Sequence, residues 1–167
     1  MKKGEIYEGV IEKVDFPNKG YVYVEDQKVL IKNGIPGQKV RFMIQKKRSG
    51  RAQGRIMEVL EKSPLETREA VCSNFPACGG CMYQTMSYEN QLKRNETQIR
   101  DLLEEALVQG GQVNAEGKAD FEWEGIHGSP IEFGYRNKME FSFGDEYKDG
   151  PLSLGLHKKG STYDILN

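Results

Sequence analysis

The chain has 167 residues, of which 37% are hydrophobic and 29% are charged, and its formal net charge is −1. No apolar run approaches the roughly 18 residues of a membrane-spanning helix, and the N-terminus lacks the apolar stretch of a secretory signal. We therefore expect a cytoplasmic protein with no membrane partner and modest cores. The charge is uneven, because residues 1–60 hold 13 Lys and Arg against 7 Asp and Glu, whereas residues 61–167 hold 11 against 18. A basic first part favours nucleic acid as a partner, and a merely solvated basic surface is the alternative.

Short strand-like runs separated by turn residues fill the first sixty residues. Turn residues such as Pro17, Gly20 and Gly34 punctuate β-branched and aromatic segments. The predicted strands cover residues 6–14, 21–24, 29–31, 39–45 and 52–60. A sheet of this size is best protected by closing on itself, so the pattern predicts a small all-β barrel.

Four segments of this region carry a resemblance to a known domain. They are Gly9-Val10-Ile11, Gly20-Tyr21-Val22-Tyr23-Val24, Ile35-Pro36-Gly37-Gln38-Lys39-Val40 and Gln53-Gly54-Arg55-Ile56. Over residues 1–62 the chain resembles the TRAM domain, an OB-like RNA-binding barrel. The resemblance implies that one barrel face binds the RNA backbone, in a salt-dependent and sequence-tolerant way. The candidate contacts are Lys46, Lys47, Arg48, Arg51 and Arg55.

Ser63-Pro64 marks the predicted boundary to a partial α+β domain over residues 63–167. Ser87 is a good N-cap and Gly110-Gly111 a good stop, so the sequence predicts one long helix over residues 87–108. Its predicted apolar face consists of Tyr88, Leu92, Asn95, Ile99, Leu102, Leu103 and Ala106. Antiparallel strands are predicted near residues 121–126, 138–143, 152–157 and 163–166, the second and third as a hairpin.

All three cysteines of the chain lie within ten residues, as Cys72, Cys78 and Cys81 around Gly79-Gly80. Clustered thiolates select zinc or an iron–sulfur cluster, and either centre normally has four ligands. Zinc would take His127 or His157 as the fourth ligand, although neither has ligand-like spacing to the cysteines. A thioredoxin-like redox pair is not supported, because no βαβ unit surrounds Cys78 and Cys81.

Three segments in a fixed order carry a second resemblance. They are Cys72-x5-Cys78-Gly-Gly-Cys81-x2-Gln84, then residues 134–141 (GYRNKMEF), then residues 154–161 (LGLHKKGS). Together they resemble the bacterial RNA (uracil-5-)-methyltransferases, in particular the 23S rRNA branch that carries an iron–sulfur cluster. The resemblance implies a four-iron four-sulfur cluster on the three cysteines, with a fourth cysteine missing from this sequence. It also implies RNA contacts at Gln84, Arg136, Asn137 and Lys138. An ion pair to a nearby carboxylate is the alternative for Arg136.

Methylation of uracil at C5 needs a thiolate to add at C6, a methyl donor and a base. The family places these in a C-terminal Rossmann-like domain that binds S-adenosylmethionine, and the sequence carries no such domain. We therefore expect the RNA-recognition part of a methyltransferase, a truncated or proteolytic piece inactive by itself, with 23S rRNA as partner. We also expect self-association through the helix at residues 87–108. The alternative is a freestanding, non-catalytic TRAM-type module whose zinc site has three cysteines and a histidine.

Overall fold

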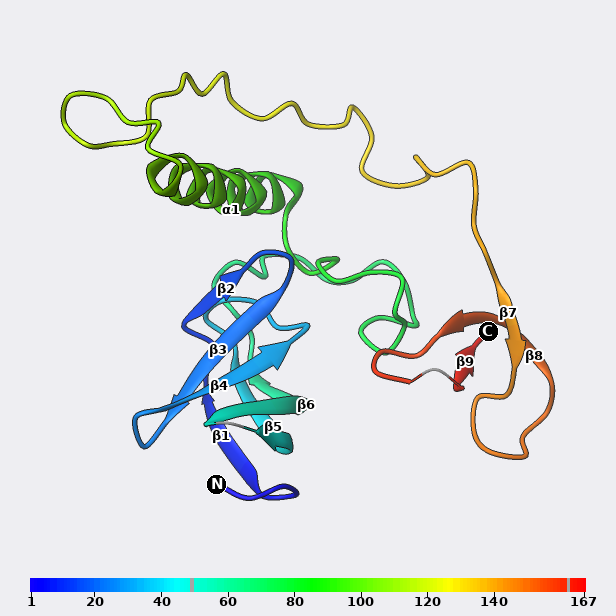
Figure 1. Ribbon diagram of the computed structural model, residues 1–167. Coiled ribbons are helices and arrows are strands. Elements are labelled where there is room, and N and C mark those ends of the chain that lie inside the picture. The colour runs from blue at the N-terminus through cyan, green and yellow to red at the C-terminus, as the bar shows by residue number, and fades with distance from the viewer. Residues whose placement is uncertain (49, 162) are drawn as a thin grey trace. The chain divides into compact units, whose positions relative to one another are not determined.

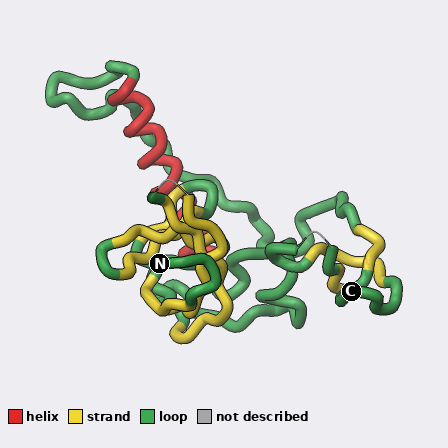
Figure 2. The backbone as a smooth tube through the Cα atoms, turned by 60° about the horizontal axis from the view of Figure 1, so that its bottom comes forward, coloured by secondary structure: helices red, strands yellow, loops and turns green. Residues whose placement is uncertain are grey.

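The computed structural model describes residues 1–48, 50–161 and 163–167, which group into two compact units. Unit 1 comprises residues 1–66 and 87–128, and unit 2 comprises residues 67–86 and 129–167. Unit 1 holds a six-stranded sheet and one helix, and unit 2 holds a three-stranded sheet (Figure 1). Much of the remaining described chain is irregular (Figure 2). The domain boundary expected near residue 62 stays a prediction.

The sheet of unit 1 is mixed, with the strand order β1-β5-β6-β4-β3-β2. Its strands are β1 (Ile6–Val10), β2 (Lys13–Asp15), β3 (Lys19–Val24), β4 (Gln27–Lys32), β5 (Lys39–Arg48) and β6 (Arg51–Glu61). All neighbouring strands pair antiparallel except β4 and β6, which are parallel. The sequence therefore located every strand-forming segment of this sheet.

The run predicted as one strand over residues 6–14 is two strands, which corrects that prediction. The Ile11 N–H donates to the Gln38 carbonyl (2.9 Å), whereas the Glu12 N–H donates to the Tyr21 carbonyl (3.0 Å). The chain thus changes partner from β5 to β3 within two residues. Because of this change of partner, β1 and β2 lie at opposite edges of the sheet although they are consecutive in the chain. This arrangement is compatible with a barrel-like domain.

The core of unit 1 lies on one face of this sheet. Along β3, Gly20 and Val22 are buried while Lys19 and Tyr23 are exposed, as the alternation of a strand requires. The buried cluster consists of Ile11, Val14, Val22, Val29, Ile31, Val40, Phe42, Ile44 and Ala52. Burial of these apolar side chains is the main favourable contribution to the stability of unit 1.

The helix α1 (Tyr88–Gln109) confirms the predicted helix to within one residue. The Ser87 Oγ accepts from the Asn90 N–H (3.2 Å), and the Gly110 N–H donates to the Ala106 carbonyl (2.9 Å). The predicted apolar face is not buried: Leu102 and Leu103 are exposed, and the buried side chain of this fully described helix is Gln98. Self-association through this face stays a prediction.

No strand forms over residues 121–126, so that prediction is wrong. The alternating aromatic residues pack beside α1 instead of pairing in a sheet. The Trp123 indole N–H donates to Glu96 (2.6 Å), and the Arg100 guanidinium carbon lies 5.8 Å from the centre of the Trp123 ring. Contacts with α1 thus explain the alternation of aromatic residues that led to the prediction of a strand.

Unit 2 contains β7 (Ser142–Gly144), β8 (Ser153–His157) and β9 (Ile165–Leu166), which pair antiparallel in that order. The predicted hairpin is confirmed, with Phe143 opposite Leu154. The predicted strand over residues 138–143 is much shorter in the structure, because residues 138–141 have no pairing partner among the described strands. Met139, Phe141 and Phe143 alternate as a buried face would, but all three are exposed.

No helix in the described part of the chain is long and apolar enough to cross a membrane.

Candidate functional site

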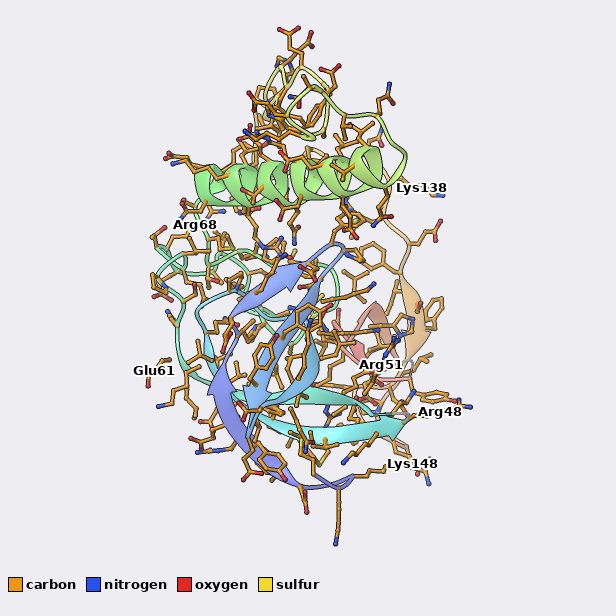
Figure 3. The ribbon with its side chains drawn as sticks, turned by 60° about the vertical axis from the view of Figure 1, so that its left-hand side comes forward. Arg48, Arg51, Glu61, Arg68, Lys138 and Lys148 are labelled. Carbon is orange, nitrogen blue, oxygen red and sulfur yellow. The ribbon has the colours of Figure 1, made fainter. Side chains whose placement is uncertain are left out.

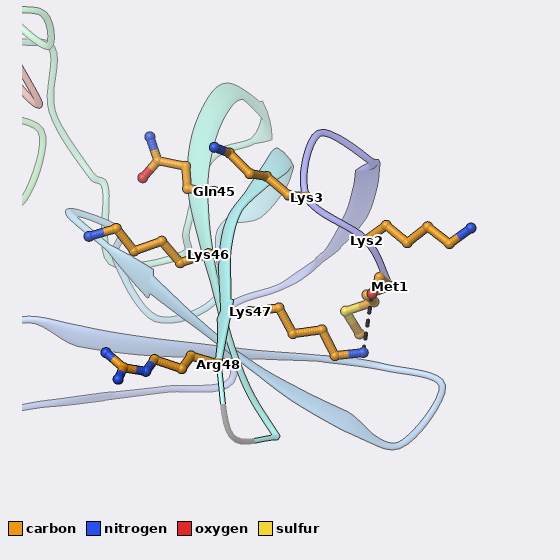
Figure 4. Close-up of a pocket in the computed structure, with 7 residues that line it drawn as sticks. All are labelled: Met1, Lys2, Lys3, Gln45, Lys46, Lys47 and Arg48. Carbon is orange, nitrogen blue, oxygen red and sulfur yellow. Dashed lines mark hydrogen bonds between the residues drawn. The ribbon is translucent and has the colours of Figure 1, made fainter.

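A basic depression lies at one end of unit 1 and contains three of the residues predicted to bind RNA. It is open, has a volume of about 580 Å³, and is built from β5 and the segment before β1 (Figure 4). Its lining consists of Met1, Lys2, Lys3, Gln45, Lys46, Lys47 and Arg48. We call this set the basic pocket.

The N-terminal segment reaches the basic pocket because it extends the pairing of β1 with β5. The Gly4 N–H donates to the Ile44 carbonyl (2.8 Å), and the Ile44 N–H donates to the Glu5 carbonyl (2.9 Å). The Lys47 ammonium in turn donates to the Met1 carbonyl (3.1 Å). The sequence reasoning missed Lys2 and Lys3. The antiparallel register of β1 with β5, continued backwards, would have placed them beside the end of β5.

The cations of the basic pocket differ in pairing from the other cations of β5. Lys39 forms an ion pair with Glu61 (2.9 Å), and Arg41 bonds Glu8 (2.8 Å) as well as Glu58. Among the described residues, by contrast, Lys46, Lys47 and Arg48 form no ion pair. Exposed cations without a carboxylate partner are available to an anionic ligand such as an RNA backbone.

Arg51 and Arg55, the other predicted contacts in unit 1, are exposed on β6. Arg51 pairs directly with Arg48, and both lie at the same end of the β5–β6 pair (Figure 3). Arg55 lies opposite Met43, further along the strand, and its guanidinium is 3.9 Å from the Met57 sulfur. The structure therefore brings Arg51 to the edge of the basic pocket, while Arg55 lies apart from it.

The three cysteines lie in an irregular loop of unit 2, which we call the cysteine loop (residues 72–84). Cys72 and Cys81 are exposed and Cys78 is half-buried. The Gly80 N–H donates to the Cys78 sulfur (3.3 Å), a contact typical of loops that hold metal-bound thiolates. Within the described residues, no three His, Cys, Asp or Glu side chains are gathered as a metal-binding group.

Backbone hydrogen bonds attach the cysteine loop to the strand β8 and the turn after it. The Gly79 N–H donates to the His157 carbonyl (2.8 Å), and the Lys159 N–H donates to the Ala77 carbonyl (2.8 Å). A Cβ at Gly79 would lie 2.8 Å from the same His157 carbonyl oxygen. This position therefore requires glycine because of the close backbone approach.

Two side chains that the sequence reasoning did not single out support the cysteine loop. Arg68 donates from Nε to the Gln84 carbonyl (2.9 Å) and also pairs with Glu132. The Lys159 ammonium lies 5.0 Å from the centre of the Phe75 ring. Burial lowers the pKa of Lys159, and the nearby Cys81 and Cys78 sulfurs act in the opposite direction. The Lys159 side chain therefore lies within electrostatic range of Cys78 and Cys81.

The remaining predicted contacts belong to unit 2 and have different surroundings. The Gln84 side-chain oxygen accepts from the Cys72 N–H (3.0 Å), so it orders the cysteine loop. Arg136, Asn137 and Lys138 are exposed on an irregular segment, and Lys138 pairs with Glu140 (2.8 Å). Of the two histidines considered for zinc, the His157 Nε2 lies 3.1 Å from the Ser142 hydroxyl and His127 belongs to unit 1.

The cysteine loop supplies thiol donors of the kind that both zinc and iron–sulfur clusters take, although within the described residues these thiols are not gathered as a metal-binding group. Three thiols occur in one glycine-containing loop, an amide N–H reaches one sulfur, and a lysine lies close to two of them. Cys72, Cys78 and Cys81 would be the ligands, and the Gly80 N–H and Lys159 would balance the charge on sulfur.

No protein-family model matches the chain. Over almost its whole length, however, the chain is similar to proteins named RNA methyltransferases. One, an uncharacterised RNA methyltransferase of Caldanaerobacter subterraneus subsp. tengcongensis, is 45% identical over 166 residues, which are 99% of this chain and 34% of the relative. Another, from Clostridium tetani, is 44% identical over 167 residues, 100% of this chain and 34% of the relative.

A relative with a more specific name is the 23S rRNA (uracil(1939)-C(5))-methyltransferase RlmD of Vibrio campbellii. It is 27% identical over 155 residues, which are 90% of this chain and 32% of that protein. The chain thus spans about a third of the length of the relatives it matches. It is homologous to part of these RNA methyltransferases.

Proposed function

We propose that the chain is the RNA-recognition part of an S-adenosylmethionine-dependent RNA (uracil-5-)-methyltransferase acting on 23S rRNA. In this proposal unit 1 is a TRAM-type barrel that binds the RNA backbone. Unit 2 holds an iron–sulfur cluster and helps to present a flipped uridine to catalytic groups outside this chain. The observation that carries the RNA-binding part is the basic pocket, where cations from two segments gather and those of β5 lack carboxylate partners among the described residues. The named relatives support the reaction class.

Salt-dependent binding of rRNA fragments to wild-type and variant chains tests the RNA-binding part. Each phosphate contact that is lost lowers the slope of log affinity against log salt by about 0.7–0.9. We expect Lys46→Gln and Lys47→Gln each to weaken binding and to reduce the slope by roughly one contact. Lys118→Gln is the matched control, since it removes the same charge from an exposed lysine that already pairs with Glu116 (3.1 Å). Equal slopes for all three variants would exclude the basic pocket as the RNA-binding surface.

Metal analysis of chain purified without oxygen tests the cluster. We expect iron and acid-labile sulfide in equal amounts, a broad visible absorption band, and loss of both after Cys78→Ser. Removal of the metal by a chelator should also increase protease cleavage between residues 67 and 86, because metal binding stabilises the loop that supplies its ligands. Zinc in place of iron would favour the alternative of a non-catalytic RNA-binding module.

A further inference from the structure

The outer face of β2, β3 and β4 carries aromatic and basic side chains that the basic pocket does not use. These three strands lie side by side (Figure 1). Their buried residues, including Val14, Val22 and Val29, point into the core, so the intervening residues line the opposite face. That face presents Tyr21, Tyr23 and Leu30 together with Lys19, Lys28 and Lys32. We call it the aromatic face.

The pairing register arranges these side chains in rows across the strands. Tyr23 lies opposite Lys28, and Tyr21 lies opposite Leu30. The Lys28 ammonium nevertheless leans over the Tyr21 ring, 3.6 Å from its centre, in a cation–π contact. Tyr21 therefore fixes the position of a cation. Tyr23, which is 47% exposed and forms no ring contact among the described residues, keeps its ring open to solvent.

A recess of about 250 Å³ borders the aromatic face where β2 and β3 meet α1 within unit 1. Phe16, which is 50% exposed, and Tyr21 line it from the sheet side, and Leu102 lines it from α1. The recess therefore offers two aromatic rings beside an apolar side chain, surroundings in which a planar base can be partly buried.

The charges around the aromatic face limit where phosphates can lie. Asp15, Asp101 and Glu105 border the recess, and Lys13 is paired with both aspartates (3.1 and 4.0 Å). Lys19 and Lys32, which lie opposite each other, are exposed and form no ion pair among the described residues. Lys19 also lines the recess on the side of the sheet, so phosphates are favoured along the Lys19–Lys32 row and disfavoured beside Asp101 and Glu105 of α1.

We propose that the aromatic face and the recess beside it bind a stretch of unpaired RNA, whose bases stack on Tyr23 of the face and Phe16 of the recess while its phosphates lie along Lys19 and Lys32. Exposed rings interleaved with free cations are the combination that single-stranded nucleic acid requires, because every base has a stacking surface and every linkage has a charge. The inference rests on the proposed RNA binding and adds a preference for unpaired bases, which the basic pocket alone does not supply.

Two probes of equal charge separate stacking from charge attraction. One is an unpaired RNA of about 12 nucleotides, within the range that one small barrel covers. The other is an abasic ribose-phosphate oligomer of the same length. Binding of both to the full chain is measured by fluorescence anisotropy at several salt concentrations. We expect the RNA to bind about tenfold more tightly than the abasic oligomer.

The variants Tyr23→Leu and Phe16→Leu should each weaken RNA binding several-fold and leave abasic binding and its salt slope unchanged. Tyr163→Leu is the matched control, since this tyrosine is 82% exposed in unit 2. Circular dichroism of each variant verifies that the sheet is intact. The inference is wrong if both probes bind equally, or if Tyr23→Leu and Phe16→Leu change the binding of neither probe. The proposed RNA binding by the basic pocket would be unaffected by that result. If neither probe binds, the proposed RNA binding fails as well.

Discussion

The two units are stabilised by different means. Unit 1 buries a continuous apolar cluster that includes Val22, Ile31 and Phe42. In unit 2 the buried apolar side chains among the described residues are Met86 and Ile165. Large apolar side chains of unit 2 are instead exposed, with Phe143 at 73% and Leu152 at 77%. Since apolar burial is the main favourable term in folding, unit 1 has a core of its own, whereas unit 2 depends more on backbone hydrogen bonds such as those between the cysteine loop and β8.

A phenylalanine in each unit gives the largest contrast. Phe42 is fully buried, so Phe42→Ala should lower the free energy of unfolding of unit 1 by about 3–5 kcal/mol. Phe143→Ala, the matched change in unit 2, should alter stability by less than about 0.5 kcal/mol. Chemical denaturation followed by circular dichroism measures both. Equal effects would mean that the two units do not differ in this way.

A smaller effect, confined to unit 2, is expected from Gly155→Ala. A Cβ at Gly155 would lie 1.8 Å from the Leu166 carbonyl oxygen, so β8 and β9 must separate. Forced overpacking of this kind costs roughly 1–3 kcal/mol. Hydrogen exchange should show faster exchange in β8 and β9 and unchanged exchange in β3 and β4. Ser153→Ala is the control, since it alters the same strand without adding an atom. Increased exchange in β3 or β4 would contradict an effect confined to unit 2.

The buried side-chain amide of Gln98 joins α1 to the sheet of unit 1, and its removal tests whether this contact stabilises the unit. The Gln98 side chain donates to the Val14 carbonyl (2.6 Å) and is buried. Gln98→Ala should cost about 1 kcal/mol, because it removes this bond and leaves the carbonyl without that donor. Gln109→Ala, at the exposed end of α1, is the control. If thermal unfolding shows the same midpoint for both variants, α1 is not coupled to the sheet through Gln98.

The smallest effect is electrostatic and concerns the first turn of α1. A hydrogen bond from Lys93 and its positive charge lower the pKa of Glu89 below its ordinary value of 4.5. A lowered pKa means that the contribution of Glu89 is present above pH 4.5 and is lost as the pH falls through the folded-state value. Helix content from circular dichroism should therefore decline slightly more on acidification in the wild type than in Glu89→Gln. An identical decline in both would show that this pair contributes nothing.

The sequence was most informative where local chemistry determines structure. Ser87 and Gly110 fixed the ends of α1, and turn glycines separated the strands of unit 1. It failed where the partner of a segment is distant. The alternation around Trp123 is the same for a strand and for a segment packed beside a helix, and only the contact with Glu96 distinguishes them.

The candidate sites follow the same rule. The cysteine spacing and the run from Lys46 to Arg48 are visible locally, so the sequence identified them. Lys2 joins that run only through the register of β1 with β5, and Lys159 reaches the cysteine loop only through the pairing of Lys158 with Cys78. These residues could not be placed without knowing which strands pair.

The order in which unit 2 is synthesised follows from its division along the chain. Its first segment, residues 67–86, is separated from the second, residues 129–167, by part of unit 1. The cysteine loop therefore leaves the ribosome about 70 residues before β8, a delay of roughly 4–14 s at ordinary elongation rates. During that interval the loop lacks the His157 carbonyl that receives Gly79, and its three thiols are open to oxygen and to stray metal ions. The cysteine loop thus has to wait for the strand whose backbone it bonds before its own conformation is complete.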